Sequence, residues 1–107
     1  MTNIHSENHR SIIATHPFVV VKFGIPNCAP CKSVSKALES ISQRFPQVAF
    51  LEVDAMIDGD LAAEMNVRTV PAIFFAVNGA YLKDSKGYHI KASDAKSMET
   101  IVQKMVE

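Results

Sequence analysis

Hydrophobic residues along the chain occur in two patterns, as short runs typical of strands and as stripes with helical spacing. Residues 18–23 form a β-branched apolar run of the kind found in a central parallel strand with both faces covered. From residue 29 the period changes to about 3.6, which predicts a helix that ends at Pro46. Residues 48–54 are a second apolar run, so the order strand, helix, strand predicts a right-handed crossover between parallel strands.

The flanking segments add further elements to this unit. Before it we expect a short strand at residues 3–5 and a helix at residues 7–15, and after it a short helix at residues 61–65. Asn78-Gly79 lies between two apolar runs and predicts a hairpin in which residues 72–77 pair antiparallel with residues 80–86. A last helix follows a cap at residue 93 or 94. The pattern therefore predicts an α/β fold with a central mixed sheet of four or five strands flanked by helices.

Composition points to one domain and removes several classes of partner. Because the chain has 107 residues, 48% of them hydrophobic, we expect a single domain over residues 1–107. Because the formal net charge is zero, the composition does not suggest binding to nucleic acid or to an anionic membrane surface. No apolar run is long enough to span a membrane. The polar start has no hydrophobic signal core, so we expect a cytoplasmic protein, and a monomer.

Four histidines raise the question of a metal site. His5, His9 and His16 are scattered through the first segment, and the chain lacks the second closely spaced ligand pair that a structural zinc site uses. We therefore expect solvated surface histidines and no metal. His89 is likewise interpreted as a histidine on a surface loop rather than as a general acid or base.

The only two cysteines, Cys28 and Cys31, are spaced C-x-x-C at the predicted helix start. Cys31 continues the apolar stripe, whereas Cys28 lies ahead of the first turn, beside the unpaired N–H groups at the positive end of the helix. Such settings lower the pKa of a thiol from about 8.5 into a range of roughly 3.5 to 7.5. We interpret Cys28 as the nucleophile that forms a mixed disulfide with a substrate and Cys31 as the resolving thiol. Two structural thiols, or half of a metal site, are the weaker alternative.

Lys22 is the anomaly of the first apolar strand. Alternation puts its side chain on the same face as Val20 and Gly24, in a strand that we expect to be covered on both sides. An unpaired buried ammonium is costly, so Lys22 has to reach solvent, find an acid or lose its proton. Glu52 or Asp54 in the next strand is a candidate acid. Extension of Lys22 to solvent and a role near the dithiol are equal alternatives.

Three stretches of this sequence resemble the thioredoxin family, and the resemblance extends from about residue 4 to the C-terminus. They are Cys28-Ala29-Pro30-Cys31 for the active site, Thr69-Val70-Pro71 for the cis-proline loop, and Asn78-Gly79 followed by Gly87 for the hairpin and the groove glycine. A lone C-x-x-C is a weak signal, but its combination with the other motifs at family-like spacing is specific. The resemblance implies the thioredoxin fold, thiol–disulfide exchange on protein substrates, no cofactor besides the dithiol, and a thioredoxin reductase that recharges it.

The resemblance also implies a substrate site around the dithiol. Pro71 is then cis and packs against the cysteines, while the backbone of Val70 pairs with an extended substrate strand. The groove is then floored by Asn27, Pro30, Val70 and Gly87. The implied substrate-binding residues are Asn27, Ala29, Pro30, Thr69, Val70, Pro71 and Gly87.

The chain departs from the family pattern at positions that bear on function. Asn27 replaces the usual tryptophan before the first cysteine, Ala29 replaces a glycine, and Lys22 replaces a buried aspartate. Our hypothesis is that Lys22, counted with the two cysteines as a catalytic candidate, lowers the pKa of Cys31 and makes the dithiol less strongly reducing. Residues 88–92 also form a longer connection than the family pattern has, so recognition at that edge is expected to differ.

Three functions are compatible with these features. A cytoplasmic disulfide reductase is the first interpretation. An oxidase or isomerase of another compartment is the second, because changes around a C-x-x-C shift the potential over roughly −270 to −120 mV among relatives. The third is a non-enzymatic binding module whose dithiol is regulatory or idle.

Overall fold

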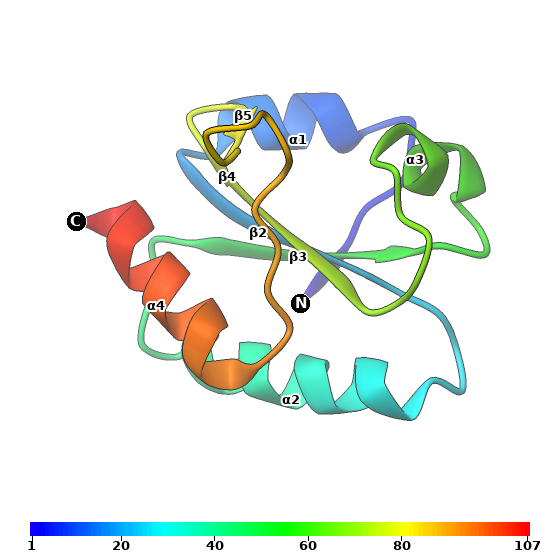
Figure 1. Cartoon of the computed structure of the whole chain (residues 1–107), viewed down its shortest axis with the longest axis horizontal. Coiled ribbons are helices and arrows are strands. Elements are labelled where there is room, and N and C mark those ends of the chain that lie inside the picture. The colour runs from blue at the N-terminus through cyan, green and yellow to red at the C-terminus, as the bar shows by residue number, and fades with distance from the viewer.

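A mixed five-stranded sheet forms the centre of the molecule, with two helices on each of its faces (Figure 1). The computed structural model describes all residues, 1–107. The strands are β1 (Thr2–Asn3), β2 (Phe18–Gly24), β3 (Ala49–Asp54), β4 (Ala72–Val77) and β5 (Ala80–Tyr81). The helices are α1 (His9–Thr15), α2 (Ala29–Ser42), α3 (Gly59–Glu64) and α4 (Ala95–Val106). The predicted α/β class and mixed sheet are confirmed.

The strand order β1-β3-β2-β4-β5 places β2 at the centre of the sheet. The first three strands of this order are parallel, and β4 and β5 are antiparallel to their neighbours. Two register pairs position the site: Lys22 of β2 lies opposite Glu52 of β3, and Phe23 lies opposite Ala72 of β4. The carboxyl end of β2 and the start of β4 therefore meet at one edge of the sheet.

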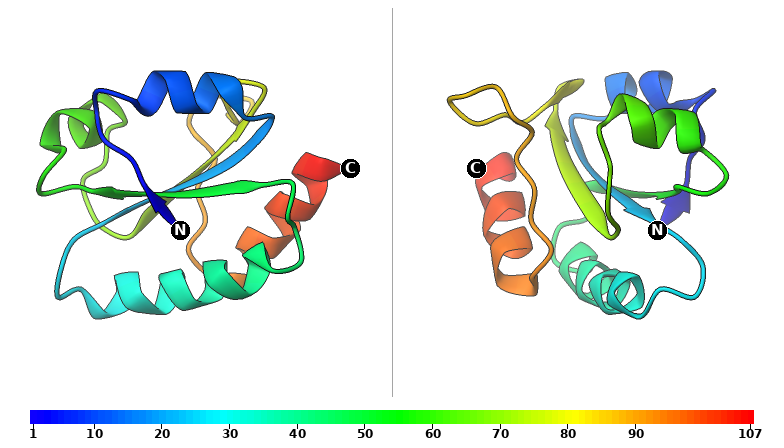
Figure 2. Two further views of the ribbon diagram at one scale, coloured as in Figure 1. Left: turned by 180° about the vertical axis from the view of Figure 1, so that it is seen from behind. Right: turned by 45° about the vertical axis from the view of Figure 1, so that its right-hand side comes forward.

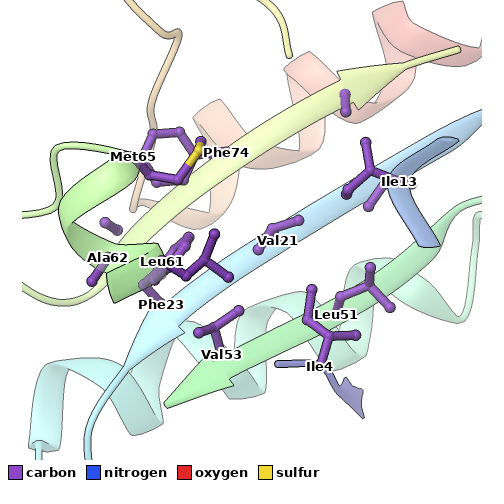
Figure 3. Close-up of a cluster of buried hydrophobic side chains, with 13 residues drawn as sticks. Ile4, Ile13, Val21, Phe23, Leu51, Val53, Leu61, Ala62, Met65 and Phe74 are labelled. Atoms are coloured by element: carbon purple, nitrogen blue, oxygen red, sulfur yellow. The ribbon is translucent and has the colours of Figure 1, made fainter. Parts of the chain in front are cut away.

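Each face of the sheet has its own hydrophobic core, because side chains alternate along every strand. Val21 and Phe23 belong to a 13-residue cluster with α1 and α3, of which Figure 3 shows Leu51, Val53 and Phe74 beside them. Val20 points the other way, into a 12-residue cluster covered by α2 and α4. The two views of Figure 2 show these helix pairs on opposite sides of the sheet. No helix is both long and apolar enough to cross a membrane.

The second strand of the hairpin is much shorter than the sequence predicted. Strand β5 covers only Ala80–Tyr81, although residues 80–86 were expected to pair with β4. After Leu82 the chain leaves the sheet in a side turn, in which Asp84 Oδ1 accepts the backbone N–H groups of Lys86 and Tyr88 at 2.9 and 3.0 Å. Ile90 N then donates to Leu82 O at 2.9 Å. Local hydrogen bonding by Asp84 therefore competes with the sheet and diverts the strand.

Two histidines are not the surface residues that the sequence predicted. His9 is buried, and its Nε2 lies 2.6 Å from the hydroxyl oxygen of Tyr81. The ring of His89 is half-buried and packs edge-on against Phe74 and Tyr81, with centroid distances of 5.5 and 5.6 Å. An imidazole has an apolar ring and a polar edge, so it fits an aromatic cluster as readily as a wet surface. His5 and His16 are exposed, as predicted.

Candidate active site: a dithiol at the start of helix α2

Cys28 and Cys31 form a disulfide at the point where the loop after β2 enters α2. Cys28 is the N-cap of the helix, with an extended backbone, and its Sγ accepts the N–H of Cys31 at 3.2 Å. Pro30 lies in the first turn, where a missing N–H costs no hydrogen bond. The three-residue spacing brings the two Cα atoms to 5.2 Å, which is within the range that a disulfide requires. The sequence thus builds the cysteine pair from local helix geometry alone.

The two sulfurs have different surroundings. Cys31 is 2% exposed and faces the sheet, as predicted from the apolar stripe, whereas Cys28 is only half-buried. Helix α2 has 14 residues, and the positive end of its dipole lies at Cys28. Of the two, Cys28 is therefore the cysteine that an incoming disulfide can reach.

Asn27 adopts a left-handed backbone conformation directly before the first cysteine, with φ at 60°. Asparagine tolerates this region better than other residues with a Cβ. This conformation provides a structural reason for Asn27, which stands where the thioredoxin-family pattern has a tryptophan. Its side chain is exposed, as are Ala29 and Pro30, so all three border Cys28 on the solvent side.

The loop before β4 reaches the same edge of the sheet as the dithiol. The Val70–Pro71 peptide bond is cis, as the resemblance implied. Because Phe23 pairs with Ala72, the chain leaves β2 toward Cys28 next to the point where Pro71 leads into β4. Contact between Pro71 and the disulfide itself stays a prediction.

A groove beside Pro71 has a volume of about 300 Å³. It lies between residues 66–73 and residues 91–93, and we call it the proline groove. Of the implied substrate-binding residues, Thr69 and Pro71 line this groove and the other five do not. Gly87 instead lies in the side turn after β5, with φ at 88° and no heavy atom within 4 Å of where a Cβ would be. A role of Gly87 in a substrate groove stays a prediction, and residues 91–93 line the proline groove on the side opposite residues 66–73.

Lys22 does not extend to solvent. The residue is 3% exposed, and its Nζ donates to Glu52 Oε1 at 2.6 Å and to Ser35 Oγ at 2.7 Å. Of the two acids considered, Glu52 is the partner, since the strand register puts it directly opposite Lys22. A carboxylate at this distance favours the charged ammonium. Glu52 thus compensates the buried lysine side chain, which would be costly without a partner.

The Lys22 ammonium lies close to the dithiol because Gly24 has no side chain. A Cβ built on Gly24 would lie 3.2 Å from Lys22 Nζ and 3.5 Å from Cys31 Cβ, so both atoms border the same small space. Sequence reasoning missed Gly24 and Ser35 as parts of this site. The signal for both was present in the spacing, because Gly24 follows Lys22 by two residues on a strand and Ser35 follows Cys31 by four on a helix.

A second cavity, also of about 300 Å³, gives access to the Lys22–Glu52 pair from the side of β1. His5 and Asp54 contribute to its lining. The Glu52 side chain is 33% exposed and the Lys22 side chain 4%, so the carboxylate is hydrated while the ammonium is not. No group of three or more His, Cys, Asp or Glu side chains is placed to hold a metal ion.

Comparison with known proteins identifies this arrangement. The sequence model of the thioredoxin family matches residues 1–104. The chain belongs to the thioredoxin family. It is 33% identical to sheep thioredoxin over 88 residues, which are 82% of this chain and 84% of that protein. It is 30% identical to thioredoxin-1 of Schizosaccharomyces pombe over 82 residues, 77% of this chain and 80% of that protein.

Other relatives show that the same domain occurs in larger proteins and that the fold is shared more widely. A segment of the protein disulfide-isomerase of Drosophila melanogaster is 31% identical over 85 residues, 76% of this chain and only 17% of that protein. The crystal structure of thioredoxin from Trypanosoma brucei brucei has a TM-score of 0.85 at 23% identity, covering 99% of this chain and 90% of that one. Together with the redox-active cysteine pair, family membership makes this protein a thiol–disulfide oxidoreductase.

Proposed function

We propose that this thioredoxin-family protein reduces protein disulfides, with Cys28 as the attacking thiol and Cys31 as the resolving thiol. The observation that carries the proposal is the unequal exposure of two bonded cysteines at a helix start. The reachable sulfur caps α2, where backbone N–H groups and the helix dipole favour a thiolate. The buried sulfur lies within bonding distance of it and away from solvent.

The reaction proceeds in two exchanges. The Cys28 thiolate attacks one sulfur of the substrate disulfide, forms a mixed disulfide, and displaces the other substrate sulfur as a thiolate, which takes up a proton. Cys31 then attacks Cys28 Sγ as a thiolate, and the second substrate sulfur leaves as a thiolate that takes up the proton lost by Cys31. Two electrons pass to the substrate, and the Cys28–Cys31 disulfide remains. A thioredoxin reductase that returns two electrons to this disulfide completes the cycle, and the chain itself needs no other cofactor.

Lys22 modulates the second exchange in this proposal. Its ammonium borders the same space as Cys31 Cβ and carries a positive charge balanced by Glu52. A nearby cation stabilises a thiolate and so lowers its pKa. Lys22 therefore makes Cys31 easier to ionise, stabilises the reduced dithiol, and renders the protein less strongly reducing than a relative with an acid at this position.

The same charge favours a second candidate function, disulfide oxidation or isomerisation. When the dithiol is stabilised, the disulfide form of the protein is a stronger oxidant, and the likeness to a segment of a protein disulfide-isomerase is consistent with this role. Equilibration of the full chain with reduced and oxidised glutathione separates the two. A potential near about −270 mV supports the reductase, and one near about −120 mV supports the oxidase.

Two single variants test the cysteine roles. Cys28→Ser is expected to abolish insulin reduction, whereas Cys31→Ser should accumulate a mixed disulfide with the substrate that reductant releases. Loss of exchange in Cys28→Ser alone excludes a binding module with an idle dithiol. Equal trapping by both variants contradicts the assigned roles. Pull-down with Cys31→Ser then identifies the substrates in the cytoplasm, the compartment that we propose because a reductase has to be kept reduced.

A further inference from the structure

The proline groove has a one-sided distribution of charge. Arg68 contributes to its lining from the loop before β4, and Lys91 contributes from the segment before α4. No carboxylate lines the groove, and both cations are exposed. The two residues lie far apart in the chain, so only the diversion of the chain after β5 brings Lys91 to the side of Pro71.

Both cations are positioned by uncharged groups. Arg68 Nε donates to Asn66 Oδ1 at 3.2 Å, which leaves the outer nitrogens of the guanidinium free. Lys91 Nζ lies 5.7 Å from the centroid of the Phe74 ring, a distance typical of a cation–π contact. Neither residue takes part in an ion pair. These contacts hold the charges in place without cancelling them.

The carboxylates nearest in sequence are engaged elsewhere. Glu64 accepts from Arg10 at 3.0 Å, and Asp94 accepts the N–H of Ser97 at 3.0 Å as the cap of α4. The loop around Cys28, residues 25–30, carries no charged side chain. A substrate strand that passes Cys28 and lies along residues 69–71 therefore meets neutral side chains at the disulfide and positive charge in the groove.

We propose that the groove selects disulfides that lie within acidic segments of the substrate protein. Carboxylates flanking the substrate cysteine bind between Arg68 and Lys91, where the guanidinium offers a two-pronged donor and the ammonium a point charge. Such complementarity raises the rate of association and rejects basic segments through like-charge repulsion. The inference rests on the proposed disulfide exchange and names the chemistry of its substrate.

A peptide series tests this selection. One synthetic peptide with a single internal disulfide is made in three versions, in which the residues flanking one cysteine are Glu, Gln or Lys. The full chain in its dithiol form reduces each peptide, and its rate constant is divided by the rate constant with which dithiothreitol reduces the same peptide. This ratio corrects for the effect of flanking charge on the intrinsic exchange rate of the peptide disulfide. We expect the Glu peptide to be reduced about tenfold faster than the Lys peptide at low ionic strength, with most of the preference lost at about 1 M salt.

A matched pair of double variants assigns the effect to the groove. Arg68→Gln with Lys91→Gln should lower the Glu-to-Lys rate ratio at least threefold. Lys86→Gln with Lys104→Gln removes the same net charge outside the groove and should retain most of the ratio. Equal rates for all peptides, or an equal loss in both double variants, overturn the acidic selection while exchange itself stands. If no version is reduced, the proposed function fails and the selection with it.

Discussion

Replacing Lys22 by methionine removes the positive charge beside Cys31 while keeping a long apolar side chain in the same space. The variant leaves Glu52 without its partner, but that carboxylate is 33% exposed and can be hydrated. The fold should therefore tolerate the change. With the cation gone, the Cys31 thiolate loses stabilisation, the pKa of Cys31 rises, and the dithiol becomes more strongly reducing.

The size of the effect follows from the distances and from the opposing charge of Glu52. Lys22 Nζ and Cys31 Cβ lie 3.2 and 3.5 Å from one point, the position of a Cβ on Gly24. For unit charges about 6 Å apart, the interaction is about 3 kcal/mol at an effective dielectric constant of about 20, and an opposite charge about 3 Å farther away cancels about two thirds of it. About 1 kcal/mol remains, which corresponds to a decrease of about 20 mV for a two-electron couple.

Glu52→Gln is the opposing perturbation. It removes the compensating charge and leaves the buried ammonium in place, so the potential should increase, by about 40 mV. The variant also leaves the 3%-exposed Lys22 without a counter-charge, which should lower the free energy of unfolding by about 3 kcal/mol. Lys22→Met should cost less, because its remaining charge is the hydrated one.

Equilibration with glutathione at several pH values from about 7 to about 10 measures the potentials. The thiolate absorbance of the reduced protein, titrated in separate samples free of glutathione, measures the pKa of Cys31. Ser35→Ala, which removes only the uncharged partner of Lys22, is the control and should move the potential less than either charge change. Shifts of the same sign in Lys22→Met and Glu52→Gln would mean that the variants act through packing. Unchanged potentials would refute the electrostatic role of Lys22.

Three further outcomes test other parts of the structure. Because φ at Asn27 is 60°, Asn27→Gly should change the free energy of unfolding by no more than a few tenths of a kcal/mol, whereas Asn27→Ala should lower it by about 1 kcal/mol. Urea unfolding measures both, and equal losses would contradict the role of the left-handed backbone at this position. Burial lowers the pKa of His9 and of His89 below the usual 6.5. Their contribution to the free energy of unfolding is therefore complete above about pH 6.5 and is lost as the pH falls through the lower folded-state pKa values. His9→Gln should reduce the slope of unfolding free energy against pH in this range, and an unchanged slope would contradict the contribution of His9. Asp84→Ala should speed hydrogen exchange of the backbone amides of Lys86 and Tyr88 without changing exchange of the amides of β4. Unaltered protection of the Lys86 and Tyr88 amides would show that the side turn does not depend on Asp84.

Local features of the sequence were sufficient for the architecture and for the cysteine pair. The continuous apolar run of residues 18–23 indicated β2, because a strand covered on both faces is apolar throughout. The period of 3.6 after residue 29 indicated α2, because a helix that buries one face is apolar at every third or fourth residue. The placement of Cys31 on the buried face and of Cys28 at the helix start followed from the same spacing. The cis bond before Pro71 was implied by the resemblance and not by the residues themselves.

Contacts between distant segments decided the rest, because no local pattern states which side chains meet across a sheet. Alternation placed Lys22 on a particular face of the strand, but only the structure showed that it is buried, and only the register of β2 against β3 selected Glu52 over Asp54 as its partner. No local pattern placed Lys91 near Pro71, and only the path of the chain after the turn at Asp84 brings both residues to one groove. Sequence alone thus placed two cysteines with exchange spacing at a helix start. Tertiary structure decided which charges surround them.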